Sequence, residues 1–257
     1  MIHPTAIIDP KAEIGEGVEI GPYSLIERDV SISEGTKVGP HVIIREGTKI
    51  GKGCQVFQFA SIGEAPQFLG YKGEKTFLQI GDRNIIREFV TLHRGTVKGG
   101  GKTVIGNDNY LMAYSHVAHD CQIGNQVVMA NGATLAGHIL IEDYAIIGGL
   151  SAIHQFCRVG THAFISGLTG VSLDIPPYML SSGSRAKLFG LNAVGLKRHH
   201  FSEETLKALK KAYRIVFRSG LTLEKAMKKV GEDDIFQIPE VQHLLQFIQH
   251  SKRGICR

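Results

Sequence analysis

The chain has 257 residues, of which 43% are hydrophobic and 21% charged, a composition that suits a folded globular protein and excludes a disordered or fibrous one. Its formal net charge of +5 is a mild basic excess, which favours an acidic partner without identifying it. We expect no nucleic-acid partner. No apolar run approaches the roughly 18 residues of a membrane span, and no secretory signal is visible at the N-terminus. The four cysteines form neither a CxxC pair nor a disulfide framework, so we expect a cytoplasmic protein.

A period of six residues governs the first two thirds of the chain. Every sixth residue from Ile2 to Ile62 is Ile or Val, and the aliphatic period resumes at Ile80 and again at Ile105, from which it continues to Val171. Six residues suit a short strand and a turn, whereas a helix or a simple alternating strand would need a different period. Three such hexads, about 18 residues, would make one coil of a triangular prism. We therefore predict an all-β parallel β-helix over residues 1–180.

The two interruptions of this period predict loop insertions near residues 63–79 and 97–103. Loops on one face of a repeat protein often form its binding face. Cys54, Cys121 and Cys157 each follow a repeat aliphatic by four residues, at a position that is usually small or β-branched. We interpret these three cysteines as core filler rather than as nucleophiles or metal ligands.

Beyond Val171 the hexads stop and a helical pattern begins. The sequence predicts one helix that Ser202 caps, a second over residues 222–231 and a third opened by Pro239. We assign residues 181–257 to a small α-helical C-terminal domain. Its many lysines and arginines indicate either a solvated helical face or a docking surface for an acidic carrier protein.

The run "YSHVAHDC" places His116, His119 and Asp120 close together within the repeat. A shift of one coil stacks Gly137 on His119 and His138 on Asp120. The same arithmetic gathers several polar residues on one edge of the prism: His93, His119, His138, His154 and Gln155. Three histidines could hold zinc and leave an open position for water. A histidine held by a carboxylate beside a glycine N–H suits general-base acyl transfer better.

Several motifs over essentially the whole chain carry a more specific resemblance: "QFASIGE", "IREFVTLHRGT", "HVAHDC", "ANGATLAGH", "AIIGG", "IHQFC" and "FGLNAVGLKR". Together they resemble the UDP-N-acetylglucosamine O-acyltransferase family of lipid A biosynthesis. This resemblance implies a left-handed coil and a homotrimer with active sites between subunits, and it implies no metal or other cofactor. It further implies transfer of a 3-hydroxyacyl group from acyl carrier protein to the 3-position of UDP-N-acetylglucosamine.

The resemblance also implies roles for individual residues. His119 would be the general base, Asp120 its orienting partner and Gly137 the donor to the oxyanion. Gly167 would form the floor of the acyl pocket and set chain length. Substrate contacts would come from Gln67, His93, His116, His138, His154, Gln155, Asn192 and Arg198.

Four positions depart from the family pattern on the nucleotide-sugar side. Phe68 and Gly70 replace two charged residues, Val194 replaces a glutamate and His199 an arginine. These changes leave open a variant acceptor, a 3-amino UDP-sugar. Two alternatives from other classes are a zinc hydratase like the γ-carbonic anhydrases and a trimeric scaffold without catalytic activity.

Overall fold

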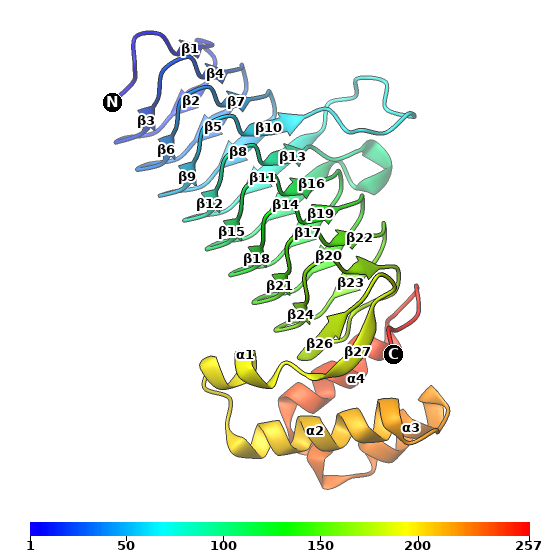
Figure 1. Cartoon of the computed structure of the whole chain (residues 1–257). Coiled ribbons are helices and arrows are strands. Elements are labelled where there is room, and N and C mark those ends of the chain that lie inside the picture. The colour runs from blue at the N-terminus through cyan, green and yellow to red at the C-terminus, as the bar shows by residue number, and fades with distance from the viewer.

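The chain winds into three parallel sheets that run along the sides of a prism, as the computed structural model of residues 1–257 shows (Figure 1). The first sheet contains β1 (Ile7–Ile8), β4 (Leu25–Ile26), β7 (Ile43–Ile44), β10 (Ser61–Glu64), β13 (Thr91–His93), β16 (His116–Val117), β19 (Thr134–Leu135), β22 (Ala152–Ile153) and β25 (Gly170–Val171). The second contains β2 (Glu13–Ile14), β5 (Ser31–Ile32), β8 (Thr48–Ile50), β11 (Phe77–Ile80), β14 (Lys102–Ile105), β17 (Gln122–Ile123), β20 (Leu140–Ile141) and β23 (Arg158–Val159). The third contains β3 (Glu19–Ile20), β6 (Lys37–Val38), β9 (Gln55–Val56), β12 (Ile85–Ile86), β15 (Tyr110–Leu111), β18 (Val128–Met129), β21 (Ile146–Ile147), β24 (Phe164–Ile165), β26 (Met179–Ser182) and β27 (Lys187–Leu191).

The hexad aliphatics form the interior of the prism. Ile26 pairs with Ile44, and Ile44 with Ile62, so side chains one coil apart lie directly above one another. All three are fully buried. The predicted all-β parallel β-helix with a helical C-terminal part is therefore confirmed, because the period of six places one aliphatic of every hexad inside. Cys54, Cys121 and Cys157 are free thiols, and each is 0% exposed.

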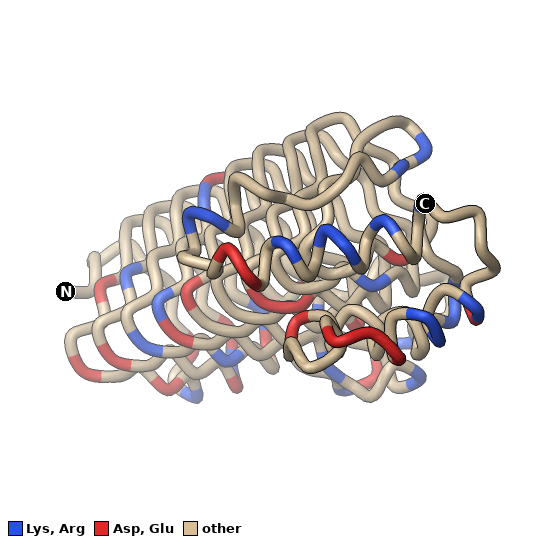
Figure 2. The backbone as a smooth tube through the Cα atoms, turned by 90° about the horizontal axis from the view of Figure 1, so that it is seen from below, with Lys and Arg blue, Asp and Glu red and all other residues tan.

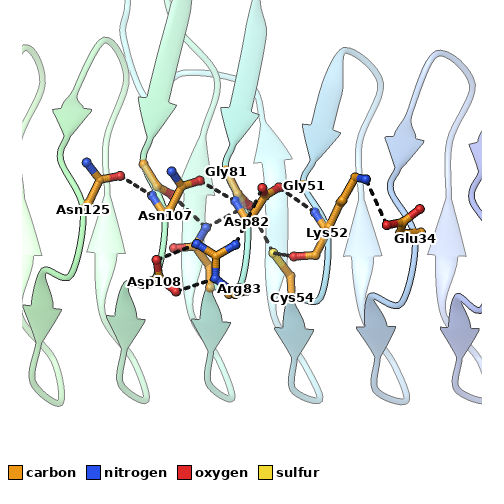
Figure 3. Close-up of polar contacts among 12 residues, drawn as sticks. Glu34, Gly51, Lys52, Cys54, Gly81, Asp82, Arg83, Asn107, Asp108 and Asn125 are labelled. Atoms are coloured by element: carbon orange, nitrogen blue, oxygen red, sulfur yellow. Dashed lines mark hydrogen bonds and ion pairs between the residues drawn. The ribbon is translucent and has the colours of Figure 1, made fainter.

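Polar side chains join successive coils at the corner between the second and third sheets (Figure 3). The side-chain oxygen of Asn125 accepts the N–H of Asn107 at 2.8 Å, and that of Asn107 accepts the N–H of Asp82 at 2.7 Å. Asp82 in turn accepts the N–H of Lys52 at 2.8 Å. This ladder supplies acceptors to corner N–H groups that no strand pairs, and so links each coil to the next.

The corner between the first and second sheets carries the histidines. We call it the histidine corner and define it as residues 118–121, 136–139 and 154–157. Two excursions leave the coils along the line of this corner: residues 65–76 between β10 and β11, and residues 94–101 between β13 and β14. Both project from the same side of the prism (Figure 1). The coil closes after the second excursion, because Leu92 pairs with Val117.

The C-terminal region contains four helices: α1 (Ala193–Arg198), α2 (Glu203–Arg218), α3 (Leu223–Gly231) and α4 (Pro239–Gln249). A short 3-10 helix, η2 (Asp234–Gln237), lies between α3 and α4. The other 3-10 helix of the chain, η1 (Val97–Gly99), lies in the second excursion. The Ser202 hydroxyl caps α2, and Pro239 opens α4. The sequence did not predict α1, because six residues with one buried side chain, Leu196, show no helical period.

The helical region rests directly on the last coils of the prism. β26 and β27 form a hairpin that extends the third sheet after the hexads have ended. Arg158 of β23 lies over the ring of Phe247 in α4, with 4.1 Å from its guanidinium carbon to the ring centroid. One continuous apolar cluster joins the interior of the prism to α2, α3 and α4. None of the helices has the length and apolar character needed to cross a membrane.

Leu92→Ala tests the aliphatic interior. Leu92 is 0% exposed and joins the coils on either side of the second excursion. We expect the substitution to lower the free energy of unfolding by about 2–5 kcal/mol, because it leaves a cavity in a stack that cannot collapse. Urea unfolding followed by circular dichroism measures the change. Ile7→Ala is the control, because the Ile7 side chain is 66% exposed, and it should lower the free energy of unfolding by less than about 0.5 kcal/mol. Equal losses in the two variants would show that Leu92 is not part of a packed interior.

Candidate active site

His119 and Asp120 form a hydrogen-bonded pair at the histidine corner. The two atoms that meet are His119 Nδ1 and Asp120 Oδ2, 2.7 Å apart. The Asp120 side chain is 0% exposed and that of His119 is 12% exposed. Because a carboxylate can only accept, His119 Nδ1 carries the proton and donates it. The other ring nitrogen, Nε2, is therefore the one with a free lone pair, as a proton acceptor requires.

Gly137 lies one coil beyond His119, as the stacking arithmetic predicts. A Cβ at residue 137 would stand 2.6 Å from His119 Cε1 and 2.9 Å from His119 Nε2. Only glycine therefore allows the imidazole to lie flat against the next coil. The Gly137 N–H donates to no acceptor within the chain. A backbone donor without a partner, one coil from His119, is suited to a developing oxyanion.

His138 completes the group around the carboxylate. Its Nε2 lies 3.5 Å from Asp120 Oδ2, and its ring is perpendicular to that of His119 at a centroid distance of 5.2 Å. Phe156 of the following coil stacks on it at 4.6 Å. Burial lowers the pKa of His138, although the Asp120 charge acts in the opposite direction. The imidazole is thus neutral at pH 7 and able to donate or accept a hydrogen bond.

Two further histidines continue the row on the preceding coils. The rings of His93 and His116 meet edge to face at 4.9 Å, and His116 Nδ1 lies 2.7 Å from the Thr91 hydroxyl. Burial, together with the charges that His116 and His119 could carry, lowers the pKa of His93 to about 4. Burial also lowers the pKa of His116. The buried His93 Nδ1 has no hydrogen-bond partner within the chain.

The first excursion brings an aromatic ring to His119. The centroid of the Phe68 ring lies 5.7 Å from that of His119, and Gln67 beside it is exposed. A Cβ at Gly70 would come within 2.7 Å of the Phe68 ring. The two departures from the family pattern are therefore coupled, because glycine at residue 70 leaves the space into which the ring of Phe68 folds.

The single chain does not gather every expected site residue. His154 and Gln155 lie on the histidine corner one coil further along, both exposed, with His154 Nδ1 3.2 Å from the Gln155 carbonyl oxygen. Gly167 is exposed at the corner between the third and first sheets. Asn192 caps α1, where its amide also donates to the His162 carbonyl at 3.0 Å, and Arg198 is exposed at the end of that helix.

The arrangement favours a proton-transfer site over a zinc site. The possible metal ligands that lie together are His119, Asp120 and His138, so only two histidines share this cluster. The 2.7 Å between His119 Nδ1 and Asp120 is a hydrogen-bond distance, and it uses the carboxylate oxygen that a metal would need. The His93 and His116 rings form a separate pair.

Sequence reasoning missed three side chains that shape the site: Thr96 and Thr103, which bond to Asp120, and Phe156, which stacks on His138. Phe156 could have been found by stacking, because it lies 18 residues after His138 in the sequence. Thr96 lies outside the hexad register, and no period would have placed it against Asp120.

The chain combines a β-helix of hexapeptide repeats with a histidine that hydrogen-bonds to a carboxylate at one corner. These two features are typical of the hexapeptide-repeat acyltransferases. Two family models match: "Bacterial transferase hexapeptide (six repeats)" over residues 102–137 and "Udp N-acetylglucosamine O-acyltransferase; Domain 2" over residues 174–256. An acyl-[acyl-carrier-protein]–UDP-N-acetylglucosamine O-acyltransferase of Thermodesulfovibrio yellowstonii is 57% identical over 256 residues, which are 100% of this chain and 99% of that protein. The enzyme of the same name from a Janthinobacterium strain is 54% identical, with the same coverage of both chains.

A solved structure agrees over the full length. The UDP-N-acetylglucosamine acyltransferase of Bacteroides fragilis superposes with a TM-score of 0.97 at 43% identity and covers 100% of both chains. The chain belongs to the UDP-N-acetylglucosamine O-acyltransferase family.

His93→Gln tests the buried histidine row through pH. An unfolded histidine gains a proton below about pH 6.5, whereas folded His93 resists protonation down to about pH 4. The unfolded state therefore binds more protons in this window, and stability falls as the pH drops through it. Between about pH 7 and about pH 5, the wild type should lose up to about 2 kcal/mol more than the variant in urea unfolding. Between about pH 7 and about pH 8 the two should change alike. Parallel losses in the acidic range would contradict a neutral, buried His93.

Proposed function

We propose that this chain transfers a 3-hydroxyacyl group from acyl carrier protein to the 3-hydroxyl of UDP-N-acetylglucosamine, the first step of lipid A biosynthesis. The observation that carries the proposal is the pair formed by His119 and Asp120 beneath the free N–H of Gly137. Relatives that bear the name of this enzyme and are more than half identical over the full length support the choice of substrates. All four cysteines are free thiols, as the reducing cytoplasm would keep them.

The geometry fits a direct transfer without an acyl-enzyme. His119 Nε2 accepts the proton of the sugar hydroxyl while the hydroxyl oxygen attacks the thioester carbonyl. The negative charge that develops on the carbonyl oxygen is stabilised by the Gly137 N–H. The tetrahedral intermediate then collapses, the C–S bond breaks, and the thiolate of the carrier takes the proton back from His119. Asp120 holds the imidazole in the required tautomer and stabilises its transient positive charge.

Neutral neighbours assist this proton transfer. His93, His116 and His138 all have a lowered pKa, so no positive charge beside His119 opposes the imidazolium that forms. In our proposal these side chains bind the polar groups of the two substrates. His154 and Gln155 extend the same edge by one coil, toward the helical region.

The acceptor and acyl sites require a second subunit. Asn192 and Arg198 follow β27, and Gly167 lies at a corner that the histidine corner does not share. We propose a homotrimer in which the histidine corner of one subunit faces Gly167, Asn192 and Arg198 of the next. Gln67 then approaches the sugar from the first excursion. His199 packs edge to face against Tyr144 and His162, at 5.1 and 4.7 Å, and so differs from a free phosphate ligand.

The helical region offers a surface for the acidic carrier. Lys207, Lys210 and Arg214 lie on exposed positions of α2 and make no ion pair within the chain, whereas Lys211 pairs with Asp233 at 2.6 Å. Basic residues recur along these helices (Figure 2). We propose that this exposed row attracts the carrier before its acyl group enters the cleft.

Product analysis tests the proposal directly. The protein is mixed with acyl carriers of different chain length and an equal mixture of UDP-N-acetylglucosamine and its 3-amino analogue, and products are read by mass spectrometry. We expect an ester at the 3-position of the hydroxyl acceptor. Exclusive amide formation would replace our acceptor with the 3-amino sugar, and the absence of any acyl product would overturn the proposed reaction.

His119→Ala tests the general base. The variant should fold normally and lose about two to four orders of magnitude in kcat, the usual contribution of general-base catalysis. Steady-state rates with long-chain acyl carrier measure the loss. His250→Ala is the matched control, because His250 is exposed after α4 and bonds only to the Gln246 carbonyl. Near-normal turnover in folded His119→Ala would exclude it as the base.

Mixing variants tests the shared site. Gly167→Met should block long acyl chains and retain shorter ones, because its side chain would occupy the floor that glycine leaves free in the proposed acyl pocket. A Cβ at residue 167 would stand 3.2 Å from the Gly149 carbonyl oxygen, so Gly167→Ala is a milder companion variant. Neither Gly167→Met nor His119→Ala alone should use a long-chain carrier. Co-refolded in equal amounts, the two should recover up to about a quarter of wild-type activity, the share of interfaces in a mixed ring where both residues are intact. No recovery would place His119 and Gly167 in one subunit's site.

A further inference from the structure

The second excursion folds back over the carboxylate of Asp120. Thr96 is only 4% exposed and makes two hydrogen bonds to this group. Its N–H donates to Asp120 Oδ1 at 2.7 Å, and its hydroxyl donates to Asp120 Oδ2 at 2.7 Å. His119 Nδ1 supplies the third close donor. Thr96 therefore provides two of the three short hydrogen bonds on a side chain that has no contact with solvent.

The direction of the Thr96 hydroxyl is fixed by its own partners. The N–H of Gly99 donates to Thr96 Oγ1 at 3.2 Å. Because an N–H can only donate, the threonine oxygen is the acceptor on that side, and its single proton remains for Asp120 Oδ2. At the far end of the excursion, the Asp120 N–H donates to Thr103 Oγ1 at 2.8 Å. The backbone and the side chain of Asp120 are thus held separately.

The glycines of "VKGGGK" form a tight cap over the carboxylate. A Cβ at Gly99 would overlap the Asp120 carboxylate, so only glycine allows this turn to close on it. Gly100 and Gly101 have φ of 96° and 81°, in the left-handed region that favours glycine. The turn therefore closes on Asp120 at Gly99, next to the two hydrogen bonds from Thr96.

These contacts bear on the proton acceptor. A buried carboxylate is costly unless donors surround it, and Asp120 fixes the tautomer of His119 only while its Oδ2 faces Nδ1. We propose that Thr96 is a positioning residue for the acyl transfer: its hydroxyl holds the Asp120 carboxylate turned toward His119 Nδ1. The inference rests on the proposed function, in which His119 Nε2 accepts the proton.

Thr96→Val tests the hydroxyl alone, because valine keeps the shape and the backbone N–H. We expect kcat to fall about ten- to hundredfold, as for the loss of a charge-assisted hydrogen bond, with the KM of both substrates unchanged. Thr96→Ser restores the hydroxyl and should recover most of the rate. Thr76→Val is the matched control, since Thr76 lies in the first excursion, is 3% exposed and has a hydroxyl with no partner.

A double-mutant cycle separates positioning from a general loss of packing. In the Asp120→Asn background, Thr96→Val should lower kcat by less than about threefold. Thr96 acts on His119 only through the Asp120 carboxylate, which this background already lacks. Equal losses in both backgrounds, or a normal kcat for Thr96→Val in the active wild-type background, would overturn the inference and leave the proposed function standing. An inactive wild type would overturn the proposed function and the inference together.

Discussion

The backbone hydrogen bonds between successive coils are the constraint on which the rest of the structure depends. Apart from the end strands and the antiparallel pair of β26 and β27, each short strand pairs in parallel with strands one coil before and one coil after it. A two-residue strand has little stability of its own, and it persists because neighbours on both sides satisfy its N–H and C=O groups. This pairing fixes which residues lie above one another, so a substitution in one coil changes the packing of the next coil.

The same stacking builds the candidate site. β16, which precedes His119, pairs with β19, which precedes Gly137. This pairing sets the distance between the two coils and so places Gly137 against the ring of His119. Asp120 and His138 both have positive φ, at 62° and 61°, and this left-handed turn directs their side chains along one edge. A rigid repeat thus supplies the precision that proton transfer needs, without loops that must close first.

The excursions add what a regular repeat lacks. A perfect coil would leave Asp120 open to water at its corner, as other corner side chains are. The second excursion covers it with Thr96 and Gly99, and the first brings Phe68 to the outer side of His119. His119 is therefore covered on its carboxylate side, where Asp120 is 0% exposed, while 12% of its own side chain remains exposed. That asymmetry suits a histidine that exchanges its proton with a ligand at Nε2.

The repeat, the coil and the row of polar residues along one edge could all be predicted from the amino-acid sequence. A period of six converts directly into inward and outward positions, so residues such as Gly137 and His138 could be placed from arithmetic alone. Ser202 and Pro239 marked helix starts because capping is a local interaction. The contacts of Thr96, the position of Phe68 against His119 and the presence of α1 could be seen only in the folded chain. These lie in segments without a period, where the chain's path depends on packing against distant residues and no local rule specifies it.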